Sequence, residues 1–312
     1  MASSATTALP GSRPVQALVK GVTALGRMLR NEVALAFRTT AGRIGLPIVV
    51  FHLVLAVFGS LLAPHAATDI QRDAENNILQ LESPSTAHWL GTDNFGRDVL
   101  SRVMSGASSI IAVSVAGAAL GIMLGTMIGM TSGYLGGKID EIVMRVMDGF
   151  MSFPSLLLAL LVLSTFGANH ENIILTIGVV FMPRVARVLR SATLSLKSLE
   201  FVQSARLRGE TAPYIIFREI LPNTIPVLAV EGSVRLSYAI LLASSLGFLG
   251  LGVQPPSSDW GLMISESRNF LVDAPWIGLA PAAGVASLVV GVNLLTDGLR
   301  QARGLPVREN HD

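Results

Sequence analysis

The chain has 312 residues, of which 51% are hydrophobic and 14% are charged, and its formal net charge at pH 7 is +2. Soluble domains carry about 25% charged residues, so this chain lacks the polar side chains that a water-exposed surface needs. The composition excludes a disordered chain, and the absence of cysteine excludes a disulfide-rich secreted domain. The basic residues lie in separated patches, which argues against a nucleic-acid partner. We predict an all-α polytopic membrane protein with about six transmembrane helices.

Six apolar segments are predicted to cross the membrane, which takes about 20 mostly apolar residues each. The fourth segment is the weakest because it runs into a basic stretch, and the fifth contains two ionisable residues. In chain order the segments are Ile44–Ala63, Ile110–Met130, Gly149–Phe166, Asn172–Met182, Pro226–Leu251 and Trp276–Leu295.

The positions of Lys and Arg predict the orientation of these segments, because cytoplasmic loops are enriched in both residues. A basic flank precedes the first segment, and six crossings then place both termini and eighteen of the 23 Lys and Arg in the cytoplasm. The predicted organisation is a cytoplasmic N-terminal segment (1–43), a first helix (44–63), an extracytoplasmic segment (64–105), a five-helix core (106–298) containing a cytoplasmic loop (192–225), and a cytoplasmic tail (299–312).

The second predicted helix carries a glycine at every fourth position, at Gly117, Gly121, Gly125 and Gly129. On a helix this spacing forms one strip without side chains, which lets another helix approach closely. We expect the strip to pack against a helix of the same chain. An interface with another subunit is the alternative.

Three ionisable residues lie in or beside the predicted membrane helices. Glu231 and Arg235 are four residues apart and therefore share one helix face, while Asp148 lies near the start of the third segment with Arg145 one turn away. Ionisable groups within the membrane often mark functional sites. One expectation is that these residues form structural ion pairs, Asp148 with Arg145 and Glu231 with Arg235. The alternative is that Asp148, Glu231 and Arg235 line and gate a pathway.

The cytoplasmic loop has the pattern of two short helices around a turn. Residues 194–208 contain neither proline nor glycine, and Gly209 follows them as a typical helix stop. Thr211 is predicted to cap the second helix, and Pro213 suits its first turn.

In that second helix an apolar face is expected from Tyr214, Phe217, Ile220 and Leu221. Pro222 is predicted to end it, and Pro226 to begin the next membrane helix. The two short helices would then project from the membrane as a hairpin. The alternative is an amphipathic helix that lies in the headgroup layer.

Several segments resemble a known family. EFVQSARLRGETAPYIIFREILPN, from Glu200, is similar to the EAA loop of bacterial ABC importer permeases, although Gln203 and Ser204 replace the Glu and the first Ala of that pattern. Three more segments are similar to the dipeptide/oligopeptide/nickel permeases, most closely to the DppC/OppC-type subunit. They are HWLGTDNFGRDVLSRVMSGA (88–107), MDGFMSFPSLLLAL (147–160) and SLGFLGLGVQPPSSDWG (245–261).

The resemblance implies an ABC type I importer permease of the bacterial inner membrane, which transports short peptides or related small solutes. It implies a second related permease, two cytoplasmic ABC ATPase subunits and an extracytoplasmic solute-binding protein as partners, with ATP and Mg on the ATPases and no cofactor on this chain. The ATPase-docking residues that it implies are Gln203, Ser204, Ala205, Arg206, Gly209, Pro213, Leu221 and Pro222.

The sequence contains no pattern typical of a catalytic or metal site. The segment SGYLGGKID, from Ser132, lacks the first glycine of a nucleotide-binding P-loop, and the five histidines are widely separated along the chain, which predicts no metal cage. Two alternatives remain at this point. A channel or secondary transporter would need no docking element, and a membrane-embedded enzyme would need clustered His, Cys or carboxylate groups.

Overall fold

The structure is a computed structural model that describes residues 33–303 of the chain. In this part of the chain the backbone forms helices and three isolated β-bridges. The helices are α2 (Thr40–Leu62), α3 (Val99–Leu135), α4 (Gly137–Met151), α5 (Ser155–Phe166), α6 (His170–Leu196), α7 (Glu200–Leu207), α8 (Ala212–Tyr214), a π-helical turn (Ile215–Ile220), α9 (Leu221–Phe248), α10 (Trp260–Ser267), a 3₁₀ turn (Arg268–Phe270) and α11 (Trp276–Ala302).

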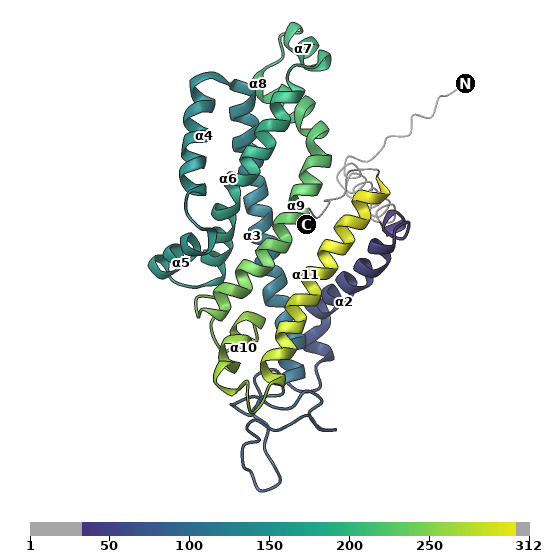
Figure 1. Cartoon of the computed structure of the whole chain (residues 1–312), viewed down its shortest axis with the longest axis vertical. Coiled ribbons are helices and arrows are strands. Elements are labelled where there is room, and N and C mark those ends of the chain that lie inside the picture. Colours follow the sequence, from purple (N-terminus) through teal and green to yellow (C-terminus); the bar gives the residue numbers. More distant parts are fainter. Residues whose placement is uncertain (1–32, 304–312) are drawn as a thin grey trace, which may run out of the picture.

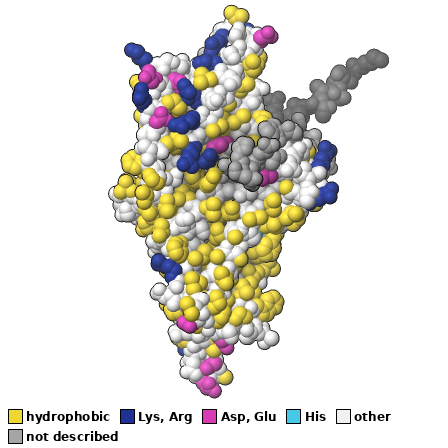
Figure 2. Space-filling view, viewed as in Figure 1, with side chains coloured by type: hydrophobic (Ala, Val, Ile, Leu, Met, Phe, Trp, Pro, Cys, Tyr) yellow, Lys and Arg dark blue, Asp and Glu magenta, His cyan; other side chains and the backbone are white. Residues whose placement is uncertain are grey.

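The long helices form one elongated bundle (Figure 1). α3 and α6 pack along most of their length, α2 and α11 pack together on one side, and α4 and α5 lie on the other. The short helices α7 and α8 stand at one end, and residues 64–98 cover the opposite end. Hydrophobic side chains cover the middle of the visible face (Figure 2), as expected of a surface that meets lipid.

Five helices in the described part are long and apolar enough to cross a membrane, and the bent pair α4 and α5 makes a sixth crossing if it is counted as one. The predicted third crossing, Gly149–Phe166, is not one helix, because α4 ends at Met151, α5 begins at Ser155 and the two meet at an angle of 86°. Pro154 explains the break: it lacks an N–H group and disfavours helical geometry at the preceding residue. With 12 residues, α5 has a length of only about 18 Å.

The prediction that Pro222 ends a helix and Pro226 begins another is also wrong. Residues Ala212–Phe248 form one continuous helix of 37 residues. The π-helical turn widens the backbone just before Pro222, and the N–H of Leu221 donates to the carbonyl of Ile216, five residues earlier. The wider turn relieves the crowding that proline creates in a regular α-helix, so the chain continues into the membrane without a break.

The glycine strip of α3 faces α6. A Cβ atom added to Gly117 would lie 2.7 Å from the Cβ of Ile177, and Gly121 is similarly close to Gly178 and Phe181. Gly125 and Gly129 continue the same contact along α6. The two helix backbones therefore touch over several turns.

Two of the segments that carry the family resemblance meet at the end of the bundle opposite α7. The indole N–H of the fully buried Trp260 donates to the carbonyl of Val103 at 2.8 Å, and Gly106 lies directly against the backbone of Ser258. Beside them, Arg102 contacts the carboxylates of Asp93 and Glu266 at 2.6 and 2.9 Å. These contacts join residues 64–98 to α3 and α10.

Candidate functional site

The hairpin between α6 and α9, residues 197–220, turns at Gly209. Gly209 has φ +80°, a left-handed conformation that glycine adopts without strain. Its N–H donates to the carbonyl of Arg206 at 2.9 Å, and the N–H of Glu210 donates to the carbonyl of Ala205 at 3.2 Å. α7 therefore ends where the sequence predicts. Thr211 precedes α8 in extended conformation, but its side chain makes no capping hydrogen bond.

The inner face of the hairpin is an apolar cluster. Val202, Ala205, Ile215, Ile216 and Ile220 are buried against Met130 of α3 and Val185 and Leu189 of α6. The predicted apolar face was wrong in part, because Tyr214 and Phe217 are exposed and Leu221 is only half-buried. The π-helical turn explains the difference: it brings residues five apart in sequence, rather than four, onto one face.

The outer face of the hairpin exposes both polar and apolar side chains. Leu207, next to the turn, is 90% exposed, far more than a leucine with a packing partner. Most of the predicted docking residues share this face or its flanks. Gln203, Ser204, Arg206, Gly209, Pro213 and Pro222 are exposed, whereas Ala205 points into the cluster. Leu207 is not among the residues predicted from the sequence, although its position between two arginines beside the turn is a visible signal.

Polar contacts hold the hairpin against α3. Arg206 lies over the ring of Tyr134, with its guanidinium carbon 4.9 Å from the ring centre, and its Nε donates to the Tyr134 hydroxyl at 3.3 Å. Lys197 donates through Nζ to the carbonyl of Gly133 at 2.8 Å. With the apolar cluster, these contacts make the hairpin a rigid extension of the bundle.

Further along α9, the structure brings Glu231 and Arg235 into a buried ion pair. The Nε of Arg235 donates to the Oε1 of Glu231 at 2.6 Å, and each residue is only 8% exposed. The guanidinium also lies 5.8 Å from the ring centre of Phe181 and 5.7 Å from that of Tyr238. Its Nη1 has no hydrogen-bond partner among the described residues.

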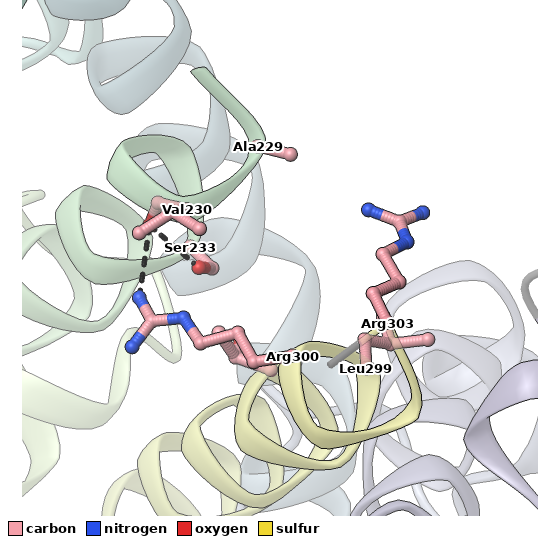
Figure 3. Close-up of a pocket in the computed structure, with 7 residues that line it drawn as sticks. Ala229, Val230, Ser233, Leu299, Arg300 and Arg303 are labelled. Carbon is pink, nitrogen blue, oxygen red and sulfur yellow. Dashed lines mark hydrogen bonds between the residues drawn. The ribbon is translucent and has the colours of Figure 1, made fainter. Parts of the chain in front are cut away.

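A small cavity of about 60 Å³ lies between α9 and α11 (Figure 3). Arg300 of α11 reaches across and donates to the carbonyl of Val230 at 3.3 Å. Ligand pockets usually measure about 300–1,000 Å³, so this space is far too small for a peptide. The contact instead joins the ends of α9 and α11 that lie nearest the hairpin.

The predicted pairing of Asp148 with Arg145 is wrong. Asp148 forms its ion pair with Arg187 of α6, and Arg145 pairs with Glu141 at 3.6 Å within α4. α6 packs against α4 and presents Arg187 and Arg190 to the acidic residues of that helix, whereas the 79% exposed Arg145 stays with Glu141 of its own helix. Asp148 is therefore part of a bridge between α4 and α6.

A comparison with known protein families identifies the family of this chain. Residues 121–303 match the family described as binding-protein-dependent transport system inner membrane component. The chain belongs to this family. It is a permease subunit and a multi-pass protein of the inner membrane, and the predicted all-α fold of an ABC importer permease is confirmed.

Several known proteins are similar to the permease over most of its length. It is 36% identical to the dipeptide transport system permease protein DppC of Alkalihalophilus pseudofirmus, over 83% of this chain and 84% of that protein. It is 38% identical to the glutathione transport system permease protein GsiD of Pectobacterium atrosepticum, over 88% of each, and 38% identical to the probable D,D-dipeptide transport system permease protein DdpC of Escherichia coli, over 81% and 83%.

A solved structure shows the same fold. The permease aligns with a chain of the MetNI methionine ABC transporter in an inward-facing conformation with a TM-score of 0.54 and 16% identity, over 66% of this chain and 96% of that one. Family membership implies ATPase and binding-protein partners for the permease.

Proposed function

We propose that this permease imports short peptides or related small peptide-like solutes. The relatives named above transport dipeptides, D,D-dipeptides and glutathione, which share amide bonds and charged termini. The cavity between α9 and α11 is too small for such a solute. In this proposal the transport path runs between this chain and a second, related permease.

The hairpin docks onto a cytoplasmic ATPase subunit. The observation that carries this proposal is Leu207, which is 90% exposed at the tip of an otherwise rigidly packed hairpin. Because its support is rigid, a partner pocket can bury this side chain at little cost in conformational freedom. Gln203, Ser204 and Arg206 supply the polar rim around it.

Movement of the hairpin reaches the membrane through a continuous helix. The second limb of the hairpin and α9 are one helix, Ala212–Phe248, which carries Glu231 and Arg235. A rigid displacement at the tip is therefore transmitted to the buried ion pair. ATP binding at the ATPases favours one arrangement of this helix over another, and this shift changes the side of the membrane to which the path opens.

The complete transporter contains two cytoplasmic ATPase subunits, two related permeases and an extracytoplasmic solute-binding protein. ATP and Mg bind the ATPases, and both termini of the permease lie in the cytoplasm with the hairpin. Lys and Arg gather toward the hairpin end in Figure 2, in support of this orientation.

Leu207→Asp tests the docking proposal. Val272→Asp is the matched control, because Val272 is 94% exposed and lies between α10 and α11, at the opposite end of the bundle. We expect Leu207→Asp to reduce co-purification of the ATPase subunits and ATP-dependent uptake by at least tenfold, with unchanged membrane insertion, and Val272→Asp to keep ATPase binding. Wild-type ATPase binding by Leu207→Asp would refute the proposal.

A further inference from the structure

The end of the bundle opposite the hairpin brings together three potential metal ligands. His65, His88 and Asp98 each offer one ligand atom, and these atoms lie within 4.8 Å of one another. The five histidines are widely separated along the chain, but the turn after α2 and the segment before α3 bring His65 and His88 together, with ring centres 5.1 Å apart and ring planes at 40°. Residues 23 positions apart in sequence therefore share one site.

The three side chains are held in position by the surrounding backbone. Asp98 caps α3: its Oδ2 accepts from the N–H of Ser101 at 2.8 Å and from the Ser101 hydroxyl at 2.7 Å. The same hydroxyl oxygen accepts from the backbone N–H of His65 at 3.0 Å. Ser101 thus fixes both the carboxylate and the backbone of one histidine, as residues beside a metal site often do.

Two of the three candidate ligand groups, His88 and Asp98, are hydrogen-bonded to each other, and a bound ion would replace that contact. The Nδ1 of His88 lies 3.0 Å from the Oδ1 of Asp98. The ring nitrogens of His65 make no hydrogen bond to any described residue. His88 and Asp98 are buried, at 4% and 1% exposure, while His65 is partly exposed, so the site is open on one side.

We propose that His65, His88 and Asp98 bind one divalent transition-metal ion of the kind that prefers imidazole and carboxylate ligands, such as Zn²⁺, Co²⁺ or Ni²⁺. A tetrahedral ion with bonds of about 2.0–2.1 Å holds its ligand atoms about 3.4 Å apart, close to the separation between His88 and Asp98. Three protein ligands and an open position match the ligand number of an accessible site.

Such an ion would join the end of α2, the segment before α3 and the first turn of α3. It would stabilise the part of the chain that the ion pairs of Arg102 also hold in place. The proposal is independent of the hairpin and of the transported solute.

Co²⁺ titration of the purified full-length permease tests the proposal. For this experiment the permease is purified through an affinity tag that contains no histidine. Binding is followed by the visible absorption of tetrahedral Co²⁺. We expect one Co²⁺ per chain, displaced by Zn²⁺. His65→Ala is expected to weaken binding at least tenfold, and Asp98→Asn to do the same while retaining an acceptor for the cap of α3.

His170→Ala is the matched control, because His170 is exposed at the start of α6 and lies outside the group. We expect it to bind Co²⁺ like the wild type. Absence of saturable Co²⁺ binding in the wild type, or equal affinity in the wild type and His65→Ala, would overturn the proposal. The His65 side chain makes no hydrogen bond in the described part of the chain, so we expect His65→Ala to fold and insert like the wild type.

Discussion

A Cβ atom added to Gly125 would lie 2.7 Å from the carbonyl oxygen of Met182, because the backbones of α3 and α6 are in direct contact there. The same Cβ would lie 2.5 Å from the Cβ of Val185. Neither neighbour is the flexible end of a side chain, so a methyl group at this position forces the helices apart. The contact lies between the hairpin and the opposite end of the bundle, and it helps the two helices to move as one body.

Gly125→Ala should therefore destabilise the permease. Overpacking of a tight contact costs about 1–3 kcal/mol, and the expected result is a lower melting temperature in detergent. Gly149→Ala is the matched control, since a Cβ at Gly149 of α4 would meet no described atom within 4 Å. Alanine favours a helix over glycine by about 1 kcal/mol, so this variant should be as stable as the wild type or more so. Equal melting temperatures for the two variants would contradict the prediction.

Gly209→Val should disturb the hairpin turn. At φ +80° a β-branched residue is strongly strained, whereas asparagine tolerates left-handed geometry better. No described atom lies within 4 Å of a Cβ at this position, so the effect comes from the backbone alone. We expect weaker ATPase co-purification for Gly209→Val and near-normal binding for Gly209→Asn. Loss of binding in both variants to the same extent would point to a cause other than the turn.

Replacing one partner of the ion pair in α9 should lower the free energy of unfolding more than replacing both. Glu231→Ala leaves the guanidinium of Arg235 buried without its carboxylate, which costs about 3–5 kcal/mol for a buried pair. The double variant Glu231→Ala with Arg235→Ala should recover part of this loss in a thermal unfolding assay. Arg145→Ala is the control: its pair with Glu141 is 79% and 69% exposed, so the expected change is below about 1 kcal/mol. Additive effects of the two α9 substitutions would argue against a coupled pair.

The orientation is testable because the sequence contains no cysteine. In intact cells, a membrane-impermeant thiol reagent should label Gln80→Cys, in the segment before α3. Lys138→Cys, in the first turn of α4 and outside the proposed docking residues, should be labelled only after the membrane is permeabilised. Both residues are exposed, so accessibility within the protein does not limit either reaction. Labelling in the reverse order would invert the proposed topology.

Local patterns in the sequence were sufficient to predict much of this fold. Apolar runs located the membrane helices, because the length and composition of such a helix are set by the bilayer. Gly209 located the turn of the hairpin, because a left-handed backbone position strongly favours glycine. The four-residue spacing placed Glu231 and Arg235 on one face, where they form an ion pair. Each of these features depends on residues close together in the chain.

Other features were decided only by tertiary structure. Asp148 pairs with Arg187 rather than with Arg145, and the π-helical turn carries the chain through Pro222 without a break. The partner of the glycine strip, α6, and the meeting of His65 with His88 likewise follow from how distant segments pack. The physical reason is the same in each case: helical periodicity tells which residues share a face, but only the packed bundle determines what that face contacts.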